Sequence, residues 1–316
     1  MQNITNFLDR RQTIIYFAAI ITAILVSTLT GLKIPETAIN PALGLMLFAT
    51  FLQVPLDRLR QAFRNLRFFA ALLLANFILI PVLVFALSRL LPGDPLVQLG
   101  VLFVLLTPCV DYVLTFSHLG RADTHLLLAA TPVLLLAQML LLPVYLSLLA
   151  PQNTFAMLQA GPFAAAFVWL IVLPLLLATL LRAWAARRDY GKIVFYRLSI
   201  LPVPATALVL CIIILVVWPQ FSAAAHRVWQ VIPIYVLFAV CAPLLGLLAA
   251  RLMRLPVGAA RALSFSTATR NSLVIMPLAL TVPGAVPVIP TVIITQTIIE
   301  LLSELAYIRV IPRIIK

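Results

Sequence analysis

Two polar clusters interrupt otherwise apolar stretches of the sequence, and both hold residue types that are rare in apolar helices. In the first cluster, Cys109 and Asp111 directly follow the pair Thr107-Pro108. A thiolate is a soft ligand. An ionised aspartate inside a bilayer costs at least about 2.5 kcal/mol, so it must face a partner, face a cavity or carry a proton. A buried structural acid is the alternative interpretation of Asp111.

The second cluster surrounds Arg270, which is nearly always charged. Hydroxyl and amide side chains flank it on both sides. Its planar donors suit a carboxylate, a phosphate or another oxyanion. The alternative is a structural pair with Asp111, Glu300 or Glu304, and the two roles do not exclude each other. The predicted substrate-binding residues are Asn76, Cys109, Asp111, Thr269, Arg270, Asn271 and Ser272.

A third polar feature is the series Gln296, Glu300 and Glu304, which are spaced four apart and share one helix face. Two acids on one face of a spanning helix indicate an inward polar stripe or a proton relay. Glu304 lies five residues before Arg309, so we expect it in a cytoplasmic vestibule, paired with a loop arginine. Asp111 and Glu300 are therefore the predicted proton relay.

Other chemistry has little support in the sequence. The three histidines, His118, His125 and His226, lack the spacing of metal ligands. The three cysteines all lie in apolar stretches, which argues against a disulfide framework. No phosphate-binding loop and no hydrolase motif is present. We expect no metal, no cofactor and no enzyme activity; the alternative is an intramembrane enzyme that uses Asp111 and Glu300 as an acid pair.

The amino-acid composition indicates that these residues belong to a membrane protein. Of the 316 residues, 64% are hydrophobic and only 10% are charged, and the mean hydropathy is +1.14, which excludes a soluble globular protein. The net charge of +13 comes mostly from basic residues in short gaps between apolar runs, and no nucleic-acid-binding motif accompanies it. The predicted partner is the lipid bilayer, not nucleic acid. The start of the chain, MQNITNFLDRR, has no features of a cleaved signal peptide.

The apolar runs predict an all-α polytopic membrane protein with ten transmembrane helices. The second run is short, and the fourth and ninth contain the helix-breaking residues Pro108 and Pro277. The predicted spans are 13–31, 40–55, 68–91, 97–119, 124–150, 162–184, 194–217, 230–252, 259–281 and 286–311.

Positive charge alternates along the gaps between these spans. With ten spans, 18 of the 22 basic residues fall on one side, including the clusters at 58–67 and 182–197. Basic residues favour the cytoplasmic side. We therefore predict a multi-pass protein of the inner (plasma) membrane with both termini in the cytoplasm.

Ten spans divide into two sets of five, and an odd number of spans in each half makes related halves inverted. The uncharged segment 150–161 is the natural join, so we expect one repeat at 1–151 and a second at 152–316. The fourth and ninth spans then occupy matching positions. Paired broken helices of this kind indicate the binding site of a transporter.

Four stretches resemble one known family: GLMLFATFLQVPLDRLRQAFRN at 44–65, ANFILIP at 75–81, TPCVDYVLTFSHLGRAD at 107–123 and FSTATRNSLVIMPLAL at 265–280. The resemblance is to the bile acid:sodium symporter superfamily, as a divergent member near its arsenite-permease branch. It implies ten spans in two inverted repeats, with the fourth and ninth helices unwound and crossing. It also implies a core of spans 3–5 and 8–10 that moves against a panel of spans 1, 2, 6 and 7.

This chain departs from the family pattern at positions that bind sodium in sodium-coupled members. Where sodium-coupled members have a serine–asparagine pair in the fourth span, this chain has Val113 and Leu114, and their ninth-span glutamate and glutamine are matched by Ser266 and Arg270. Thr131 and, in part, Asn76 still match other ligands. Because a carboxylate is lost and a fixed cation is gained, we expect that the sodium site is lost and that transport is not coupled to sodium.

Pro108-Cys109 and the run Ser117-His118-Leu119 resemble the arsenite branch, although its ninth-span glutamate falls on Leu273 here. The leading hypothesis is a secondary transporter working by alternating access. It would export arsenite, antimonite or a related small solute, coupled to protons. The alternative is an organic-anion transporter of the same superfamily, in which Arg270 holds a carboxylate or sulfonate. A channel or sensor without a transport cycle is a further alternative class, and a homodimer is possible.

Overall fold

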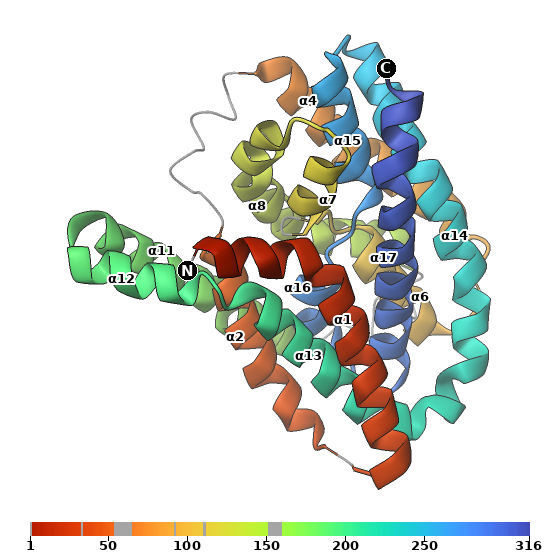
Figure 1. Ribbon diagram of the computed structural model, residues 1–316. Helices are drawn as coiled ribbons and strands as arrows, with labels where there is room; N and C mark the ends of the chain where they lie inside the picture. The colour runs from red at the N-terminus through yellow and green to blue at the C-terminus, as the bar shows by residue number, and fades with distance from the viewer. Residues whose placement is uncertain (1, 33, 54–64, 92, 110–111, 151–159) are drawn as a thin grey trace. The chain divides into compact units, whose positions relative to one another are not determined.

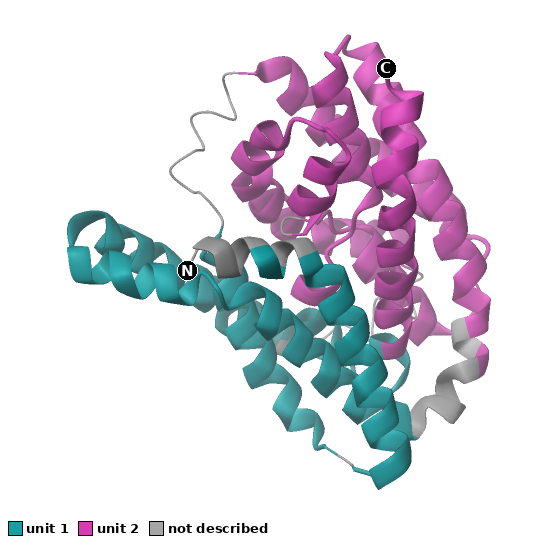
Figure 2. Cartoon of the chain, in the orientation of Figure 1, with its two compact units in different colours: residues 1–54, 159–225, 276–290 teal, residues 55–158, 226–275, 291–316 magenta. Residues whose placement is uncertain are grey.

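The computed structural model describes every residue except 1, 33, 54–64, 92, 110–111 and 151–159, and within these described residues the chain forms helices and turns but no β-strand (Figure 1). The helices divide into two compact units (Figure 2). Unit 1 comprises residues 1–54, 159–225 and 276–290. Unit 2 comprises residues 55–158, 226–275 and 291–316.

Unit 1 is built mainly from long apolar helices that pack along one another. The helix α1 packs against α13, and α2 packs against both α13 and α11. The bounds of its elements are α1 Gln2–Thr30, η1 Glu36–Ala38, α2 Ile39–Phe51, α10 Ala160–Phe167, η4 Val168–Val172, α11 Leu173–Arg187, α12 Asp189–Leu198, α13 Pro202–Val217 and η5 Trp218–Gln220.

Unit 2 contains the two polar clusters and the acidic helix face. Its helix α15 packs against α4, α7 and α8 (Figure 1). Its elements include α4 Leu66–Leu74, η3 Ala75–Leu79, α5 Ile80–Ser88, α6 Pro95–Leu105, α7 Val113–Leu119, α8 Thr124–Leu149 and α15 Val257–Ala268; α14 Phe221–Leu252, α16 Ser272–Ala279 and α17 Val288–Ile314 contribute residues to both units.

Six helices in the described part of the chain are long and apolar enough to cross a membrane. They correspond to the predicted first, third, fifth, sixth, eighth and tenth spans. The other predicted spans fall on shorter or divided helices: α2, the pairs α6–α7 and α15–α16, and α12–α13, which makes a seventh span if it is counted as one bent span. An all-helical chain with six candidate membrane spans is thus observed in the described residues, while the count of ten stays a prediction.

The predicted seventh span, 194–217, falls on two helices, α12 and α13, which meet at a bend of 40°. Pro202 begins α13, and Pro204 follows it. Proline disfavours helical geometry in the residue before it. The bend therefore falls just before Pro202.

Two spans contain one turn of wider π-helix, at η3 in unit 2 and at η4 in unit 1. In each case a proline, Pro81 or Pro174, lies six residues after the first residue of the π segment. Proline has no N–H and its ring crowds the carbonyl four residues earlier, which lies inside the π segment. Such bulges are frequent at functional sites, and η3 carries Asn76.

Candidate functional site

The two helix breaks of unit 2 hydrogen-bond to each other through their backbones. The helix α6 ends at Leu105 and α7 begins at Val113, while α15 ends at Ala268 and α16 begins at Ser272. The N–H of Cys109 donates to the carbonyl of Thr269 at 3.1 Å, and the N–H of Asn271 donates to the carbonyl of Thr107 at 2.8 Å. Pro108 and Arg270 form the antiparallel bridge between these bonds.

This pairing explains how unwound backbone exists inside an apolar unit. Buried N–H and carbonyl groups that leave a helix must find other partners. Pro108 removes a donor and disfavours helix at Thr107, whose hydroxyl donates to Phe103 O at 3.0 Å. The two breaks satisfy each other's backbone groups, and we refer to residues 107–109 and 269–271 as the crossing.

Arg270 lies at the crossing with a fully buried side chain. Its Nη2 donates to Asn76 Oδ1 at 3.0 Å, Ser266 O at 2.8 Å and Thr267 O at 2.7 Å. Its Nη1 reaches Leu105 O at 3.4 Å. The guanidinium group is therefore surrounded by neutral oxygens, which we call the oxygen cage.

The other side of this guanidinium faces an aromatic ring. Its carbon lies 5.5 Å from the centre of the Phe238 ring, which favours a cation. Among the described residues, Arg270 Nε has no hydrogen-bond partner. No salt bridge joins this guanidinium to a described carboxylate, so the predicted pair with Glu300 or Glu304 is not made through its side chain.

Asn76 is also fully buried and makes contacts in two directions. Its Nδ2 donates to Leu72 O at 3.2 Å and to Ser266 Oγ at 3.1 Å, while Oδ1 accepts from Arg270. Asn76 lies in the π turn η3, and its contacts reach Ser266 in α15 and Arg270 in the break that follows. The amide thus links the third and ninth spans.

Glu300 contacts the crossing from α17, and only 3% of it is exposed. Its Oε1 accepts from Tyr112 Oη at 2.6 Å, and its Oε2 accepts from the backbone N of Arg270 at 2.8 Å. Gln296 Nε2 also donates to Oε2, and Ser272 Oγ donates to Gln296 Oε1 at 2.7 Å. A polar chain therefore runs from Ser272 through Gln296 to Glu300.

The structure overturns the expectation for Glu304. This side chain is fully buried, and its Oε1 lies 2.5 Å from Thr269 Oγ1. No described arginine pairs with it. Proximity to Arg309 in sequence suggested a vestibule, but the helical repeat turns Glu304 to the face of Glu300 and leaves Arg309 exposed.

The expectation for Pro277 is also wrong. Pro277 lies within α16, whereas the break in the ninth span is at 269–271, before that helix begins. Proline can stay inside a helix when the lost bond is tolerated. Here the break forms instead where the freed backbone of residues 269 and 271 finds partners at 107 and 109.

Most of the other predicted residues lie together. Cys109, Thr269, Asn271 and Ser272 are all buried at or beside the crossing. Cys109 is fully buried and is not part of a disulfide. Asp111 lies outside the described residues. The sequence did not single out Tyr112, because a lone tyrosine after Asp111 carries no signal of its partner 188 positions away.

Thr131, which matched a hydroxyl ligand of sodium-coupled proteins, lies within α8. Its hydroxyl donates to Leu127 O of its own helix at 3.0 Å. In the part of the chain that the structure describes, no three His, Cys, Asp or Glu side chains could together hold a metal ion.

A small cavity of about 10 Å³ lies beside Glu300, between α14, α15 and α17. Gln296, Glu300 and Tyr307 are among its lining residues, and a space of this size holds about one water molecule. Polar groups at its wall give such a water hydrogen-bond partners.

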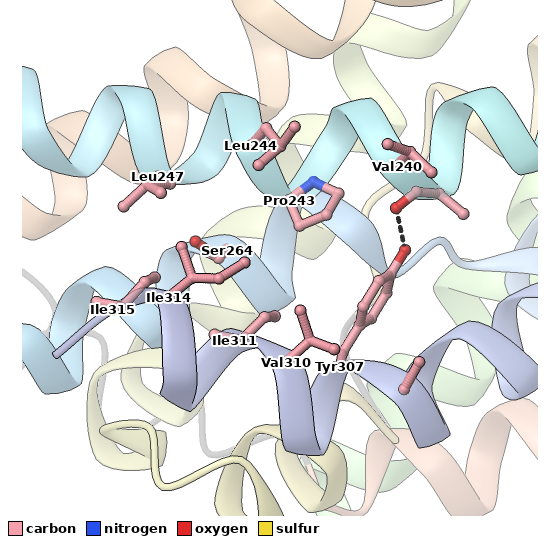
Figure 3. A pocket seen from close by; sticks show the side chains of 12 residues that line it. Val240, Pro243, Leu244, Leu247, Ser264, Tyr307, Val310, Ile311, Ile314 and Ile315 are labelled. Carbon is pink, nitrogen blue, oxygen red and sulfur yellow. Dashed lines mark hydrogen bonds between the residues drawn. The ribbon is translucent and has the colours of Figure 1, made fainter.

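A larger groove of about 240 Å³ lies between the same three helices (Figure 3). Apolar side chains line it, apart from Ser264 and Tyr307. The hydroxyl of Tyr307 donates to Ala239 O, and both residues line the cavity as well as the groove. This hydrogen bond therefore borders both the small cavity and the groove.

Comparison with known families gives one match. The model of the Sodium Bile acid symporter family matches residues 40–227, which is more than half of the chain. The match includes Asn76 and Cys109, whereas Arg270, Glu300 and Glu304 lie beyond it. No curated protein matches the chain at a significant level.

Proposed function

The chain belongs to the sodium bile acid symporter family, whose members are membrane transporters and not enzymes, and we propose that it is a secondary active transporter working by alternating access. The observation that carries this proposal is the crossing in unit 2. Two broken helices with their ends together present backbone dipoles and polar side chains to a solute. A packed enzyme core or a simple helical bundle has no need of such a break.

The division into two compact units supports a mechanism in which one unit moves against the other. Unit 2 contains the predicted spans 3–5 and most of 8–10, and unit 1 contains spans 1, 2, 6 and 7. We propose that unit 2 carries the solute site and unit 1 supports it. The proposal includes ten spans in two inverted repeats, an inner-membrane location and cytoplasmic termini.

We propose arsenite, antimonite or a related small solute as the exported substrate. Cys109 supports this because a thiolate is a soft ligand that suits a thiophilic metalloid. Its N–H is tied to Thr269, so the thiol is carried by one of the two unwound segments. Movement of the crossing would then move the thiol with it.

Coupling to sodium is not part of the proposal, because a guanidinium already occupies the oxygen cage. Three oxygens lie within 3.0 Å of Arg270 Nη2. Oxygens so placed are what a small hard cation needs, and a fixed positive charge among them repels a second one. The guanidinium thus takes the place that a bound cation would otherwise occupy in the oxygen cage.

Proton coupling is proposed through Glu300, with Asp111 as a second acid. Glu300 contacts the backbone of Arg270, Tyr112 and Gln296, which all lie at or near the crossing. Protonation would weaken at least one of these hydrogen bonds and change which conformation is favoured. A proton gradient can drive export in this way.

The family match itself favours a second candidate, an organic anion such as a bile acid. In that case Arg270 and the helix starts at the crossing would attract the carboxylate or sulfonate. Cys109 would then have no part in binding.

Replacement of Cys109 by serine separates the two candidates. In an arsenite-sensitive host, the wild-type protein should confer resistance, and Cys109→Ser should abolish it. The matched control is Cys211→Ser, which alters a thiol in α13 and should leave resistance intact. Resistance that survives Cys109→Ser, or taurocholate uptake by both variants, would favour the organic anion.

A further inference from the structure

Thr269 and Glu304 form a contact that determines where a hydrogen atom must lie. Thr269 Oγ1 lies 2.7 Å from Phe265 O and 2.5 Å from Glu304 Oε1. Both distances fall within the range of an O–H···O hydrogen bond, so each contact needs a hydrogen between its oxygens.

A threonine hydroxyl carries one hydrogen, and a backbone carbonyl can only accept. A separate hydrogen for each contact requires that the hydroxyl hydrogen of Thr269 goes to Phe265 O, which can only accept. The hydrogen in the second contact has to come from the carboxyl group of Glu304. Counting donors thus assigns a proton to Glu304.

The second oxygen of Glu304 supports the same assignment independently. Oε2 is buried and has no hydrogen-bond partner among the described residues. An ionised oxygen in that position would lack compensation for the loss of water, which is far more costly for a charged group than for a neutral one. A neutral carboxylic acid leaves only a carbonyl oxygen unpaired.

Glu300, one helical turn away, is arranged differently. It accepts from Tyr112 Oη, Arg270 N and Gln296 Nε2. Tyr112 Oη lies 2.6 Å from Glu300 but 3.1 Å from Arg270 O. Because only the first distance is in the usual O–H···O range, the tyrosine hydrogen goes to Glu300. Three donors at one carboxylate are typical of its ionised form.

We propose that Glu304 is a further proton-binding site of unit 2, beside Glu300, and that in this conformation Glu304 holds a proton while Glu300 is ionised and balances the charge of Arg270. The step from proton binding to transport rests on the function proposed above. Thr269 connects proton binding with the crossing, since its hydroxyl contacts Glu304 and its carbonyl accepts a hydrogen bond from Cys109 N. Loss of the proton removes the Thr269–Glu304 hydrogen bond or reverses its direction, and it places a second negative charge beside Glu300.

Several other titratable or charged groups surround this pair on the packed elements. They are Tyr307 on α17, Tyr235 on α14, Arg270 in the ninth-span break, and Cys109 and Tyr112 in the fourth-span break. Of these, Arg270 is the group with a positive charge, and the glutamate with which that charge interacts is Glu300. The local charges therefore favour a neutral Glu304 beside an ionised Glu300.

Infrared spectroscopy of the purified full-length protein at neutral pH tests this assignment. The wild type should show the carbonyl band of a buried, neutral carboxylic acid. Glu304→Gln should abolish the band, and Glu300→Gln should retain it. Thr269→Val, which removes the hydroxyl partner, should shift the band toward that of an acid without a hydrogen bond.

Absence of the band from the wild type, or its persistence in Glu304→Gln, would overturn the assignment. If Glu304→Gln does not fold, the band in Thr269→Val decides the question. An unshifted band in that variant would also overturn the assignment of the proton to Glu304. The measurement needs neither substrate nor gradient. A protein that has the band but carries no solute would refute the proposed function and leave the proton site standing.

Discussion

The Nη2 of Arg270 donates a hydrogen bond to Oδ1 of Asn76 at 3.0 Å, which joins two buried side chains 194 positions apart in the chain. Asn76 is held by a π turn of the third span, and Arg270 lies in the break of the ninth. This contact therefore ties the unwound crossing to the third span, which packs against α6, α8 and α15.

Removal of the Asn76 amide should destabilise the protein. Asn76→Leu leaves the buried guanidinium without one acceptor, which costs about 1–3 kcal/mol. The midpoint of thermal unfolding in detergent should fall accordingly. Asn40→Leu, the same substitution at an exposed position of α2, should change stability by no more than about 0.5 kcal/mol. Equal effects of the two changes would show that the contact contributes nothing.

The oxygen cage should accept a cation once its guanidinium is removed. In Arg270→Gln the carbonyls of Ser266 and Thr267 lose their charged donor, so sodium chloride should raise the unfolding temperature relative to choline chloride. The wild type and Arg270→Lys, which keeps a positive charge, should show no sodium-specific shift. A shift in the wild type would contradict the interpretation of Arg270 as a tethered cation.

The two glutamates should respond differently to the same substitution. Glu300→Gln places an NH₂ group where three donors converge, and one unsatisfied donor costs about 1–3 kcal/mol. Glu304→Gln should be nearly neutral, because its amide N–H can donate to Thr269 Oγ1 as the acid does. Urea unfolding of both variants provides the comparison. A larger loss for Glu304→Gln would argue that this carboxyl is ionised.

Close packing of α14 on α15 depends on Gly246. A Cβ at this position would overlap Thr267 Oγ1 and would lie 2.8 Å from Ser264 Cα. Gly246→Ala should therefore destabilise by about 1–3 kcal/mol through overpacking. Gly161→Ala in α10, where a Cβ has no atom within 4 Å, should be neutral or stabilising. Thermal unfolding of the two variants tests the difference.

The break in the fourth span and the neighbourhood of the break in the ninth were predictable, because their signals are local. Pro108 disrupts its own helix, and the hydroxyl and amide side chains around Arg270 mark the second break. The apolar composition likewise predicted a helical membrane protein. Local sequence also predicted that residues 296, 300 and 304 share a face, since this follows from the helical repeat alone.

Partners that lie far apart in the chain were not predictable. For Arg270 the sequence offered an oxyanion substrate or an acid, Asp111, Glu300 or Glu304, as partner. The fold surrounds its side chain with carbonyl and amide oxygens and gives its backbone N–H to Glu300. Pro277 was chosen as a breaker because propensity favours it, but pairing across the crossing decides where the helix opens. Glu304 was misplaced for the same reason: its partner Thr269 is 35 positions away.

Flux in proteoliposomes tests the central claim most directly. The purified protein would be reconstituted, and arsenite movement would be followed under an imposed proton gradient, an imposed sodium gradient or neither. The account predicts saturable flux that a proton gradient drives against the arsenite gradient and that sodium leaves unchanged. Accumulation driven by sodium, or flux that neither saturates nor responds to protons, would contradict it.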